Sequence, residues 1–291
     1  MEIIFVCTGN TCRSPLAQGL MKKLLIDRGI DGIKVSSAGL AAFTGDEASE
    51  KSVNAAKKYG VDISAHRARR VSEYMLENGL FVCMTASHAE ALKPFVKEKN
   101  LFVIGNGIAD PYGGTQDDYD RCARQIREAL PRLLCSIVSL HTSIVPMNSG
   151  HIKKIAEIER KCFSLPWTEN SLREELDNEN AHFLSAVFNG QVIGYIGIIE
   201  ICGQADVTNV AVLPEYRRCG IGEKLMKEAE NGALSRSCDS ITLEVRISNS
   251  TAISLYNKSG YRREGIRKNF YEKPAEDALL MTKFFEKGQN Q

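Results

Sequence analysis

The chain has 291 residues, a length that accommodates two domains of ordinary size. Its 37 Lys and Arg residues nearly balance its 36 Asp and Glu residues, so charge favours neither a nucleic-acid-binding nor a membrane-binding protein. No apolar run approaches the roughly 20 residues that span a bilayer, and the first residues show no secretory signal. The nine cysteines, an odd number without zinc-site spacing, favour a reduced compartment. We therefore expect a cytoplasmic protein without nucleic-acid or membrane partners.

The first half of the chain alternates between strand-like and helix-like segments. Strands are predicted over residues 3–6, 33–36, 80–84 and 101–103, and helices over residues 16–28, 47–59, 71–77, 86–96 and 117–139. Strands that alternate with helices indicate a parallel sheet with helices on both faces, here a four-stranded α/β domain of flavodoxin-like type. In such sheets ligands bind at the carboxyl ends of the strands.

The pattern changes near residue 140, where residues 141–148 lack a helical period and include a proline. We therefore predict one domain over residues 1–139 and a second over residues 140–291. In the second domain, helices are predicted over residues 149–163, 169–177, 223–235 and 248–256, and strands over residues 183–188, 192–200, 205–213 and 240–245, with a first strand at residues 144–145 and a further strand from Gly260. A tight turn at Asn189-Gly190 joins the first two strands as an antiparallel hairpin. An α+β fold with a mixed sheet is expected.

A candidate active site follows the first predicted strand. The stretch from Cys7 to Pro15 has the character of a phosphate-binding loop, because its backbone N–H groups would converge at a helix N-terminus, where partial positive charge favours an anion. The residues between its cysteine and its arginine are Thr8, Gly9, Asn10, Thr11 and Cys12. Cys7 is expected to act as a thiolate stabilised by these amides and by Ser14, and Arg13 to bind two phosphoryl oxygens. The alternative is a structural cysteine, which the composition of the loop disfavours.

A phosphatase of this design needs a proton donor for its leaving group. Asp110, in the sequence Asp110-Pro111-Tyr112, is a candidate because it lies on a glycine-rich stretch, residues 105–114, that follows a predicted strand. An Asp-Pro pair is by itself more typical of a turn than of a catalytic site. The assignment of Asp110 therefore depends on the other motifs in the first half of the chain.

Nearly all of the first half resembles the low-molecular-weight protein phosphatase family. The resemblance rests on the Cys-x5-Arg-Ser-Pro loop, Ser37-Ala38-Gly39, His66-Arg67-Ala68-Arg69 and the Asp-Pro-Tyr sequence. It implies that Cys7 is a nucleophile that forms a phosphocysteine, that Arg13 holds the transition state and that Ser14 stabilises the thiolate. It also implies that Asp110 acts as general acid and then as base, and that Cys12 can trap oxidised Cys7 as a reversible disulfide.

Two details of this family bear on the substrate. Tyrosine-specific members usually carry a bulky apolar residue at the position of Thr11, whereas bacterial protein-arginine phosphatases carry threonine, which leaves room and an acceptor for a planar guanidinium. Gly113-Gly114 stands where tyrosine-type members often have a second aromatic residue, so a single aromatic wall, Tyr112, is expected. We therefore predict phosphoarginine as the preferred substrate and phosphotyrosine as the alternative. Arsenate reduction is disfavoured, because no downstream cysteine pair has a spacing that would support it.

A second glycine-rich segment follows the third predicted strand of the second half. Its residues are Arg217, Arg218, Cys219, Gly220, Ile221 and Gly222, and a predicted helix comes next. Glycines at a helix N-terminus let backbone amides approach a pyrophosphate, and the two arginines add positive charge. The pattern alone is weak, and a plain glycine-rich helix start is the commoner explanation. A dinucleotide site is disfavoured, because the preceding strands form hairpins rather than a strand-helix-strand unit.

From about residue 142 the chain resembles the GCN5-related N-acetyltransferase superfamily, and within it the bacterial RimI family that acetylates the N-terminal alanine of a ribosomal protein. The resemblance rests on Pro166-Trp167-Thr168-Glu169, Asn209-Val210-Ala211-Val212, Leu243-Glu244-Val245-Arg246, Asn249 and Arg267-Lys268-Asn269-Phe270-Tyr271. It implies Glu244 as the base for the α-ammonium group and Tyr256 as the acid for the coenzyme A thiolate. In isolation, an exposed strand-face charge and a half-buried aromatic explain these two residues better.

The same resemblance implies an acetyl-CoA site and no metal. Backbone amides of Val210, Ala211 and Val212 would hold the acetyl carbonyl and the pantetheine arm. The segment from Arg217 to Gly222 would hold the pyrophosphate, and Asn249 would contact the coenzyme from the next helix.

The predicted protein is a bifunctional enzyme, a phosphatase fused to an acetyl-CoA-dependent N-terminal acetyltransferase. Its expected partners are a phosphorylated protein and the N-terminus of a ribosomal protein. Two alternatives stay open: the acetyltransferase acts on other protein N-termini, or one half serves only as a binding module. The candidate catalytic residues in both halves favour two activities.

Overall fold

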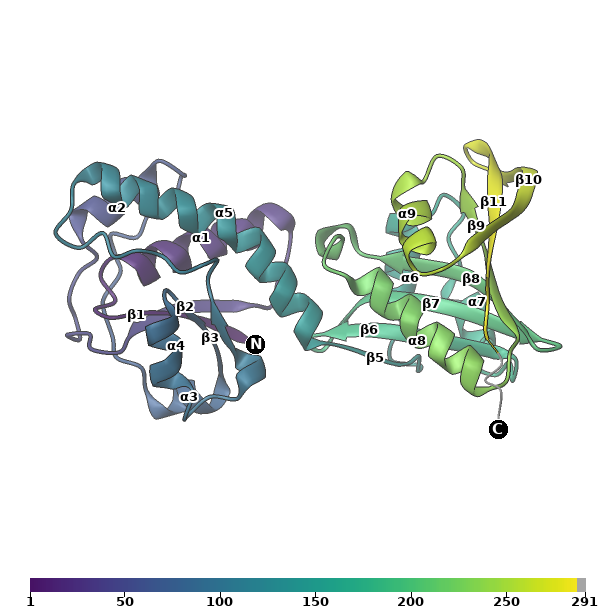
Figure 1. The fold of residues 1–291 in the computed structure, drawn as a ribbon, viewed down its shortest axis with the longest axis horizontal. Helices are drawn as coiled ribbons and strands as arrows, with labels where there is room; N and C mark the ends of the chain where they lie inside the picture. Colours follow the sequence, from purple (N-terminus) through teal and green to yellow (C-terminus); the bar gives the residue numbers. More distant parts are fainter. Residues whose placement is uncertain (287–291) are drawn as a thin grey trace. The chain divides into compact units, whose positions relative to one another are not determined.

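The computed structural model describes residues 1–286 and consists of two compact units (Figure 1). The first unit is Met1–Leu140, and the second begins at His141. Each unit contains one β-sheet with helices packed against it. No helix within residues 1–286 is long and apolar enough to cross a membrane. Across the same residues, no three His, Cys, Asp or Glu side chains form a group that could hold a metal ion.

The first unit has a sheet of four parallel strands in the order β2-β1-β3-β4. The strands are β1 (Glu2–Cys7), β2 (Lys34–Gly39), β3 (Gly79–Cys83) and β4 (Leu101–Val103), and the helices are α1 (Arg13–Arg28), α2 (Glu50–Lys57), α3 (Glu73–Asn78), α4 (Ala86–Leu92) and α5 (Gln116–His141). Helices α1 and α5 lie on one side of the sheet, and α3 and α4 lie on the other (Figure 1). Because both faces are covered, β1 and β3 are almost fully buried, which explains their continuous apolar sequences. The predicted four-stranded parallel fold is confirmed.

The helix boundaries in the first unit follow from local capping. Ser49 Oγ accepts a hydrogen bond from the Ser52 N–H, so α2 starts later than predicted. Ser72 caps α3 in the same way. In contrast, α1 starts earlier than predicted, at Arg13, so only residues 8–12 separate the end of β1 from the helix. The predicted phosphate loop therefore joins a buried strand directly to a helix N-terminus.

The second unit has a seven-stranded sheet in the order β10-β11-β9-β8-β7-β6-β5. The strands are β5 (Thr142–Pro146), β6 (Ala181–Phe188), β7 (Gln191–Ile201), β8 (Gln204–Val212), β9 (Ser240–Arg246), β10 (Arg262–Glu272) and β11 (Ala275–Phe284), and the helices are α6 (Ile152–Cys162), α7 (Glu169–Glu174), α8 (Ile221–Ser235) and α9 (Ser250–Lys258). All neighbouring strands are antiparallel except β8 and β9, so the predicted mixed sheet is confirmed. Helix α8 covers one face, and α6 and α7 cover the other (Figure 1).

One strand of the second sheet was not predicted. The sequence analysis expected a single strand after Gly260, whereas the structure has a hairpin of β10 and β11. Nearly every residue of β10 is exposed, because this strand is the edge of the sheet. The strand predicted from Gly260 corresponds to β10, and the missed strand is β11. Because the sequence of β10 lacks apolar alternation, neither its end nor the turn into β11 was recognised.

The two central strands β8 and β9 separate partway along their length. They pair from Gln204 and Ser240 to Val207 and Leu243. Beyond this point β9 continues along β11, while β8 continues along β7. A bulge at Thr208 bends β8 where the two strands part. Within the described structure, the end of β8 thus has no partner strand on its β9 side.

Candidate active sites

A buried asparagine shapes the loop between β1 and α1. Asn10 is fully buried and has a φ of 56°, which asparagine tolerates better than most residues. Its Nδ2 atom donates to Ser14 Oγ at 2.8 Å and to Ser37 Oγ at 2.9 Å, and its Oδ1 atom accepts from the Arg69 N–H at 2.9 Å. His66 Nε2 lies 2.7 Å from the Asn10 carbonyl oxygen. The Ser-Ala-Gly and His-Arg-Ala-Arg motifs therefore meet at Asn10 and hold the loop in one conformation.

Cys7, the predicted nucleophile, is the last residue of β1 and is only 2% exposed. Its Sγ atom accepts a hydrogen bond from the Asn10 N–H at 3.2 Å and lies 3.0 Å from Ser14 Oγ. Ser14 lies in the first turn of α1, so the positive end of the helix dipole faces the sulfur. Hydrogen-bond donors and a helix N-terminus around a sulfur are the surroundings of a nucleophilic cysteine.

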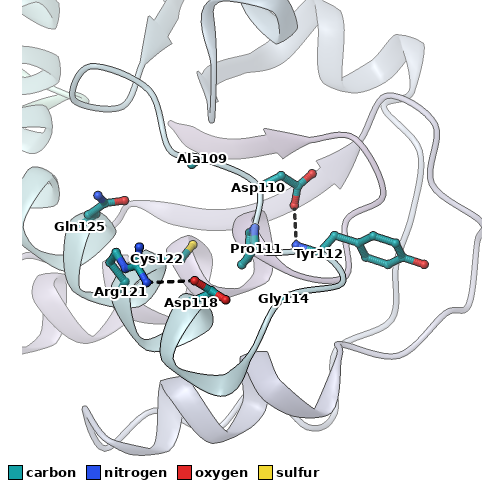
Figure 2. Close-up of a pocket in the computed structure, with 9 residues that line it drawn as sticks. All are labelled: Ala109, Asp110, Pro111, Tyr112, Gly114, Asp118, Arg121, Cys122 and Gln125. Carbon is teal, nitrogen blue, oxygen red and sulfur yellow. Dashed lines mark hydrogen bonds and ion pairs between the residues drawn. The ribbon is translucent and has the colours of Figure 1, made fainter.

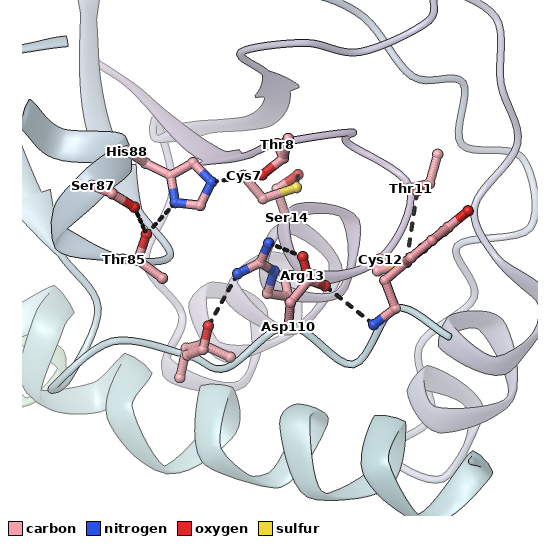
Figure 3. Close-up of polar contacts among 12 residues, drawn as sticks. Cys7, Thr8, Thr11, Cys12, Arg13, Ser14, Thr85, Ser87, His88 and Asp110 are labelled. Carbon is pink, nitrogen blue, oxygen red and sulfur yellow. Dashed lines mark hydrogen bonds and ion pairs between the residues drawn. The ribbon is translucent and has the colours of Figure 1, made fainter. Parts of the chain in front are cut away.

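The predicted clamp and the predicted acid lie together beside Cys7 (Figure 3). Arg13 Nη2 is 2.5 Å from Asp110 Oδ2, and Arg13 Nη1 donates to the Ile108 carbonyl oxygen at 3.2 Å. The Arg13 side chain is buried, whereas that of Asp110 is 47% exposed, so the ion pair joins the floor of the site to its rim. Among the described residues, Arg13 Nε is a buried donor without a hydrogen-bond partner. The guanidinium therefore retains a donor that an oxyanion could use.

Asp110 lies on the acid loop, residues 105–114, which follows β4. The Tyr112 N–H donates to Asp110 Oδ1 at 3.2 Å, so the loop orients its own carboxylate. The Tyr112 ring is 81% exposed and extends away from the loop (Figure 2). A pocket of about 280 Å³ between the acid loop and α5 is lined by Ala109, Asp110, Pro111, Tyr112, Gly114, Asp118, Arg121, Cys122 and Gln125 (Figure 2). The lining includes Asp110, the partner of Arg13, but neither Cys7 nor Arg13 itself.

A second exposed aromatic residue lies on a segment that is bonded to the phosphate loop. Phe43, 75% exposed, lies on the segment after β2. This segment is bonded to the phosphate loop, because the Leu40 N–H donates to the Cys7 carbonyl oxygen and the Ala41 N–H to that of Thr8, both at 3.0 Å. The sequence analysis expected Tyr112 as the single aromatic wall, and this expectation stays a prediction. Phe43 was not considered there because it lies in an irregular segment, where no periodic pattern marks a residue.

The remaining loop residues have distinct surroundings. Thr11 is half-buried, and its Oγ1 atom lies 3.6 Å from Cys12 Sγ. Cys12 is buried, with its sulfur 3.5 Å from both Ser49 Oγ and the Tyr119 hydroxyl. Burial and this contact with Cys12 raise the pKa of Tyr119 to about 12. Both Cys7 and Cys12 are free thiols, so their pairing on oxidation stays a prediction.

His88 was not predicted as a site residue. It lies in α4, directly after β3, and its Nε2 atom is 3.0 Å from Thr8 Oγ1 in the phosphate loop (Figure 3). A usable signal was present: His88 follows a buried strand in a parallel sheet, and ligands bind at the carboxyl ends of such strands.

In the second unit, the predicted acetyl site corresponds to the end of β8. The Leu213 N–H donates to a carbonyl oxygen of β7 at 2.9 Å. Because N–H groups alternate sides along an antiparallel strand, those of Val210 and Val212 point away from β7, toward the gap beside β9, and that of Ala211 points toward β7. The Val212 carbonyl oxygen accepts a hydrogen bond from Arg217 Nε at 3.0 Å. Val210 and Val212, but not Ala211, thus offer amides to a ligand in the gap.

The predicted pyrophosphate segment forms a left-handed turn into α8. Arg218 has a φ of 66°, and Gly220, the residue before the helix, has a φ of 78°. The first N–H groups of α8, at Ile221 and Gly222, have no partner within the helix and are suited to bind an anion. The side chains of Cys219 and Ile221 are buried, so these residues can offer a ligand only their backbone.

The predicted base and acid of the second unit both lie near Tyr271. The Glu244 carboxylate pairs with Arg267 at 2.8 Å, and the Tyr271 hydroxyl donates to the Glu244 carbonyl oxygen at 3.2 Å. Tyr256 is buried in α9, and this burial, together with the nearby Tyr271, raises its pKa. Asn249 caps α9, because its Oδ1 atom accepts from a backbone N–H at 3.1 Å. Because Oδ1 already accepts this hydrogen bond, the Nδ2 group of Asn249 is the part of the side chain left to contact a coenzyme.

A buried carboxylate that was not predicted connects two motifs of the second unit. Glu159 in α6 is fully buried, and its Oε2 atom accepts from the Trp167 N–H at 2.7 Å. Its Oε1 atom accepts from Asn209 Nδ2 at 2.9 Å and from the Tyr195 hydroxyl. Asn209 directly precedes Val210, so Glu159 fixes β8 at the edge of the gap and ties it to the Pro166-Trp167 segment.

Comparison with known proteins assigns each unit. Residues 2–143 match the low molecular weight phosphotyrosine protein phosphatase family, and residues 152–261 match the acetyltransferase (GNAT) family. A protein-arginine-phosphatase of Geobacillus stearothermophilus is 37% identical over 139 residues, which are 44% of this chain and 90% of that protein. A putative ribosomal protein bS18-alanine N-acetyltransferase of Bacillus subtilis is 41% identical over 136 residues, which are 46% of this chain and 90% of that protein. The chain belongs to both families.

The phosphatase unit has relatives named for different substrates. A low molecular weight protein-tyrosine-phosphatase of Staphylococcus haemolyticus is 33% identical over 141 residues, which are 46% of this chain and 97% of that protein. Family membership alone therefore does not choose between phosphoarginine and phosphotyrosine. The protein combines a low-molecular-weight phosphatase with a RimI-like acetyltransferase, and GNAT acetyltransferases use acetyl-CoA as the acetyl donor.

Proposed function

We propose that the phosphatase unit hydrolyses protein phosphoarginine through a phosphocysteine on Cys7. This proposal rests on the Arg13–Asp110 ion pair, which lies beside Cys7 Sγ. That sulfur already accepts a hydrogen bond from the Asn10 N–H. A nucleophile, an oxyanion clamp and a proton donor are thereby present within one loop and its neighbour.

The proposed reaction has two steps. In the first, Cys7 Sγ attacks phosphorus, a P–S bond forms, the P–N bond to the substrate guanidine breaks, and Asp110 donates its proton to the leaving nitrogen. Arg13 and the loop amides bind the equatorial oxygens as charge spreads over them. In the second, Asp110 takes a proton from a water that attacks phosphorus, the P–S bond breaks, and inorganic phosphate and the Cys7 thiolate are released.

Thr11 supports phosphoarginine over phosphotyrosine, because its small polar side chain leaves space and an acceptor for a guanidinium group. The exposed rings of Phe43 and Tyr112 could stack on a planar guanidinium as well as on a phenyl ring, so they do not discriminate between phosphoarginine and phosphotyrosine. Hydrolysis of phosphoarginine and phosphotyrosine peptides by the full chain, with Cys7→Ser as the inactive control, tests the preference. We expect faster phosphoarginine hydrolysis, and Thr11→Ile should reverse the order. Equal rates on the two peptides would contradict the assignment.

We further propose that the acetyltransferase unit acetylates the N-terminal alanine of a ribosomal protein. The separation of β8 from β9 carries this proposal, because it leaves the Val210 and Val212 amides available to a pantetheine arm. The Arg217 to Gly222 turn provides amides and an exposed Arg218 for the pyrophosphate. Bound acetyl-CoA supplies an activated acetyl group.

The side chains around the gap would handle the protons. Glu244 would accept the proton of the α-ammonium group, directly or through a water. For this its ion pair with Arg267 would have to open. Tyr256 would protonate the departing thiolate, because its hydroxyl carries a proton at neutral pH; burial raises its pKa and makes it a weaker acid than an exposed tyrosine. A cytoplasmic location stays a prediction.

Acetyl transfer to a peptide with the N-terminus of ribosomal protein bS18 tests this half. Glu244→Gln should reduce transfer while leaving the Kd of acetyl-CoA nearly unchanged, and Tyr256→Phe should lower kcat. Equal loss of transfer and coenzyme binding in the Glu244 variant would indicate a structural role. Faster transfer to peptides with other first residues would redirect the substrate assignment to different N-termini.

A further inference from the structure

The His88 ring is held at both nitrogens beside the phosphate loop, and the proposed reaction does not use it. Its Nε2 atom is 3.0 Å from Thr8 Oγ1, and its Nδ1 atom is 2.5 Å from Thr85 Oγ1. Thr85 Oγ1 in turn lies 2.8 Å from Ser87 Oγ. Figure 3 shows the ring placed between Thr8 and Thr85. Because His88 is only 7% exposed, these two hydroxyls are fixed partners of the ring.

Thr8 connects this ring to the oxyanion site. It directly follows the nucleophile, so its N–H is one of the loop amides. Its carbonyl oxygen accepts from the Ala41 N–H at 3.0 Å, and a Cβ atom at Gly39 would come within 2.5 Å of that oxygen. The segment after β2 thus holds the Thr8 backbone, and His88 holds the Thr8 side chain. A change in the hydrogen bonding of the His88 ring would therefore alter the position of Thr8 at the start of the phosphate loop.

Two charged side chains act on the ring from neighbouring elements. Burial lowers the pKa of His88, the Arg13 guanidinium lowers it further, and the Asp110 carboxylate partly opposes both effects. A neutral ring donates one hydrogen bond and accepts another. A dianion bound at Arg13 would cancel the effect of the guanidinium and favour the charged ring.

We propose that His88 is a positioning residue for oxyanion binding, which orients Thr8 and takes up a proton from solvent when a phosphoryl dianion occupies the loop. The charged ring can donate to both Thr8 and Thr85, because a hydroxyl oxygen accepts hydrogen bonds. By linkage, the factor by which the anion favours proton uptake is also the factor by which protonation tightens anion binding. The inference rests on the proposed use of this loop as an oxyanion site.

Sulfate is a suitable probe, because it stays a dianion across the range of about pH 5 to 8 in which histidine titrates. Calorimetry would give its Kd for the full chain with Cys7→Ser, which removes the thiol, and for the same chain with His88→Asn added, in which an amide replaces the titrating ring. Asp110, Arg13 and His66 are present in both proteins, so the ratio of the two Kd values isolates the change that His88 makes. We expect the Kd of the double variant relative to the single variant to rise about fivefold between about pH 7.5 and 5.5.

A ratio that stays constant over this range would overturn the proposal. Thermal unfolding would show whether His88→Asn folds, and His88→Gln would replace it if it does not. An NMR titration of the His88 ring in the Cys7→Ser protein is an independent measurement, in which the pKa of the ring must rise when sulfate is bound. An unchanged pKa would refute proton uptake. Failure of sulfate to bind either protein at any pH would instead refute the oxyanion site, and the proposed phosphatase reaction with it.

Discussion

Replacement of Asn10 by alanine tests whether the phosphate loop is held by its buried side chain. The substitution removes three side-chain hydrogen bonds, to Ser14, Ser37 and Arg69, which at about 1 kcal/mol each amount to about 3 kcal/mol. Alanine at a φ of 56° adds about 1 kcal/mol of backbone strain. The loop conformation that presents its amides should therefore lose about 4 kcal/mol, which corresponds to a fall of up to about 10³ in kcat/KM.

Hydrolysis of para-nitrophenyl phosphate by the full chain measures this loss. Asn10→Gly is the matched control, because glycine also lacks the side chain but adopts a positive φ without strain. We expect the glycine variant to recover only the backbone part, about fivefold of the lost activity. Trp167 is the single tryptophan of the chain and lies in the second unit, so its unchanged fluorescence would show that the change is confined to the first unit.

Two results would refute the reasoning. Wild-type kcat/KM in Asn10→Ala would show that the loop keeps its shape without the three hydrogen bonds. Full recovery in Asn10→Gly would show that only the backbone conformation matters, and that the contacts with Ser37 and Arg69 contribute nothing to catalysis.

Three further substitutions follow from the same structure. Gly39→Ala should lower kcat/KM of the phosphatase, because its Cβ would lie 2.5 Å from the Thr8 carbonyl oxygen; unchanged hydrolysis would show that the loop can shift freely. Asp110→Asn should lower kcat by about 10²- to 10⁴-fold, with the smallest loss on esters whose leaving groups need no proton. Glu159→Ala should destabilise the second unit by about 3 kcal/mol, because it leaves the Trp167 N–H and the buried Tyr195 hydroxyl without their acceptor and removes one of the two acceptors of Asn209 Nδ2. Denaturant unfolding followed by Trp167 fluorescence checks it, and an unchanged midpoint would contradict it.

The phosphate loop was predictable from sequence because its parts are consecutive. A strand, a run of residues that leaves amides unpaired, an arginine and a helix start lie between Cys7 and Ser14, and local backbone geometry brings them together. The Asn189-Gly190 hairpin was predictable for the same reason, since a two-residue turn sets its own pairing. In both cases the physical constraint acts over a few residues, so the sequence alone determined these features.

Contacts between distant segments were decided only by the tertiary structure. His88 reaches Thr8 because β3 lies beside β1 in the sheet, and Leu40 and Ala41 hold the loop because β2 lies on the other side of β1. The gap beside β8 exists because β9 separates from β8 and continues along β11. The sequence did not predict β11, because the preceding strand β10 is exposed and has no apolar pattern that would mark its end. Sheet order and strand separation depend on pairings between residues far apart in the chain, which no local pattern of apolar and polar residues encodes.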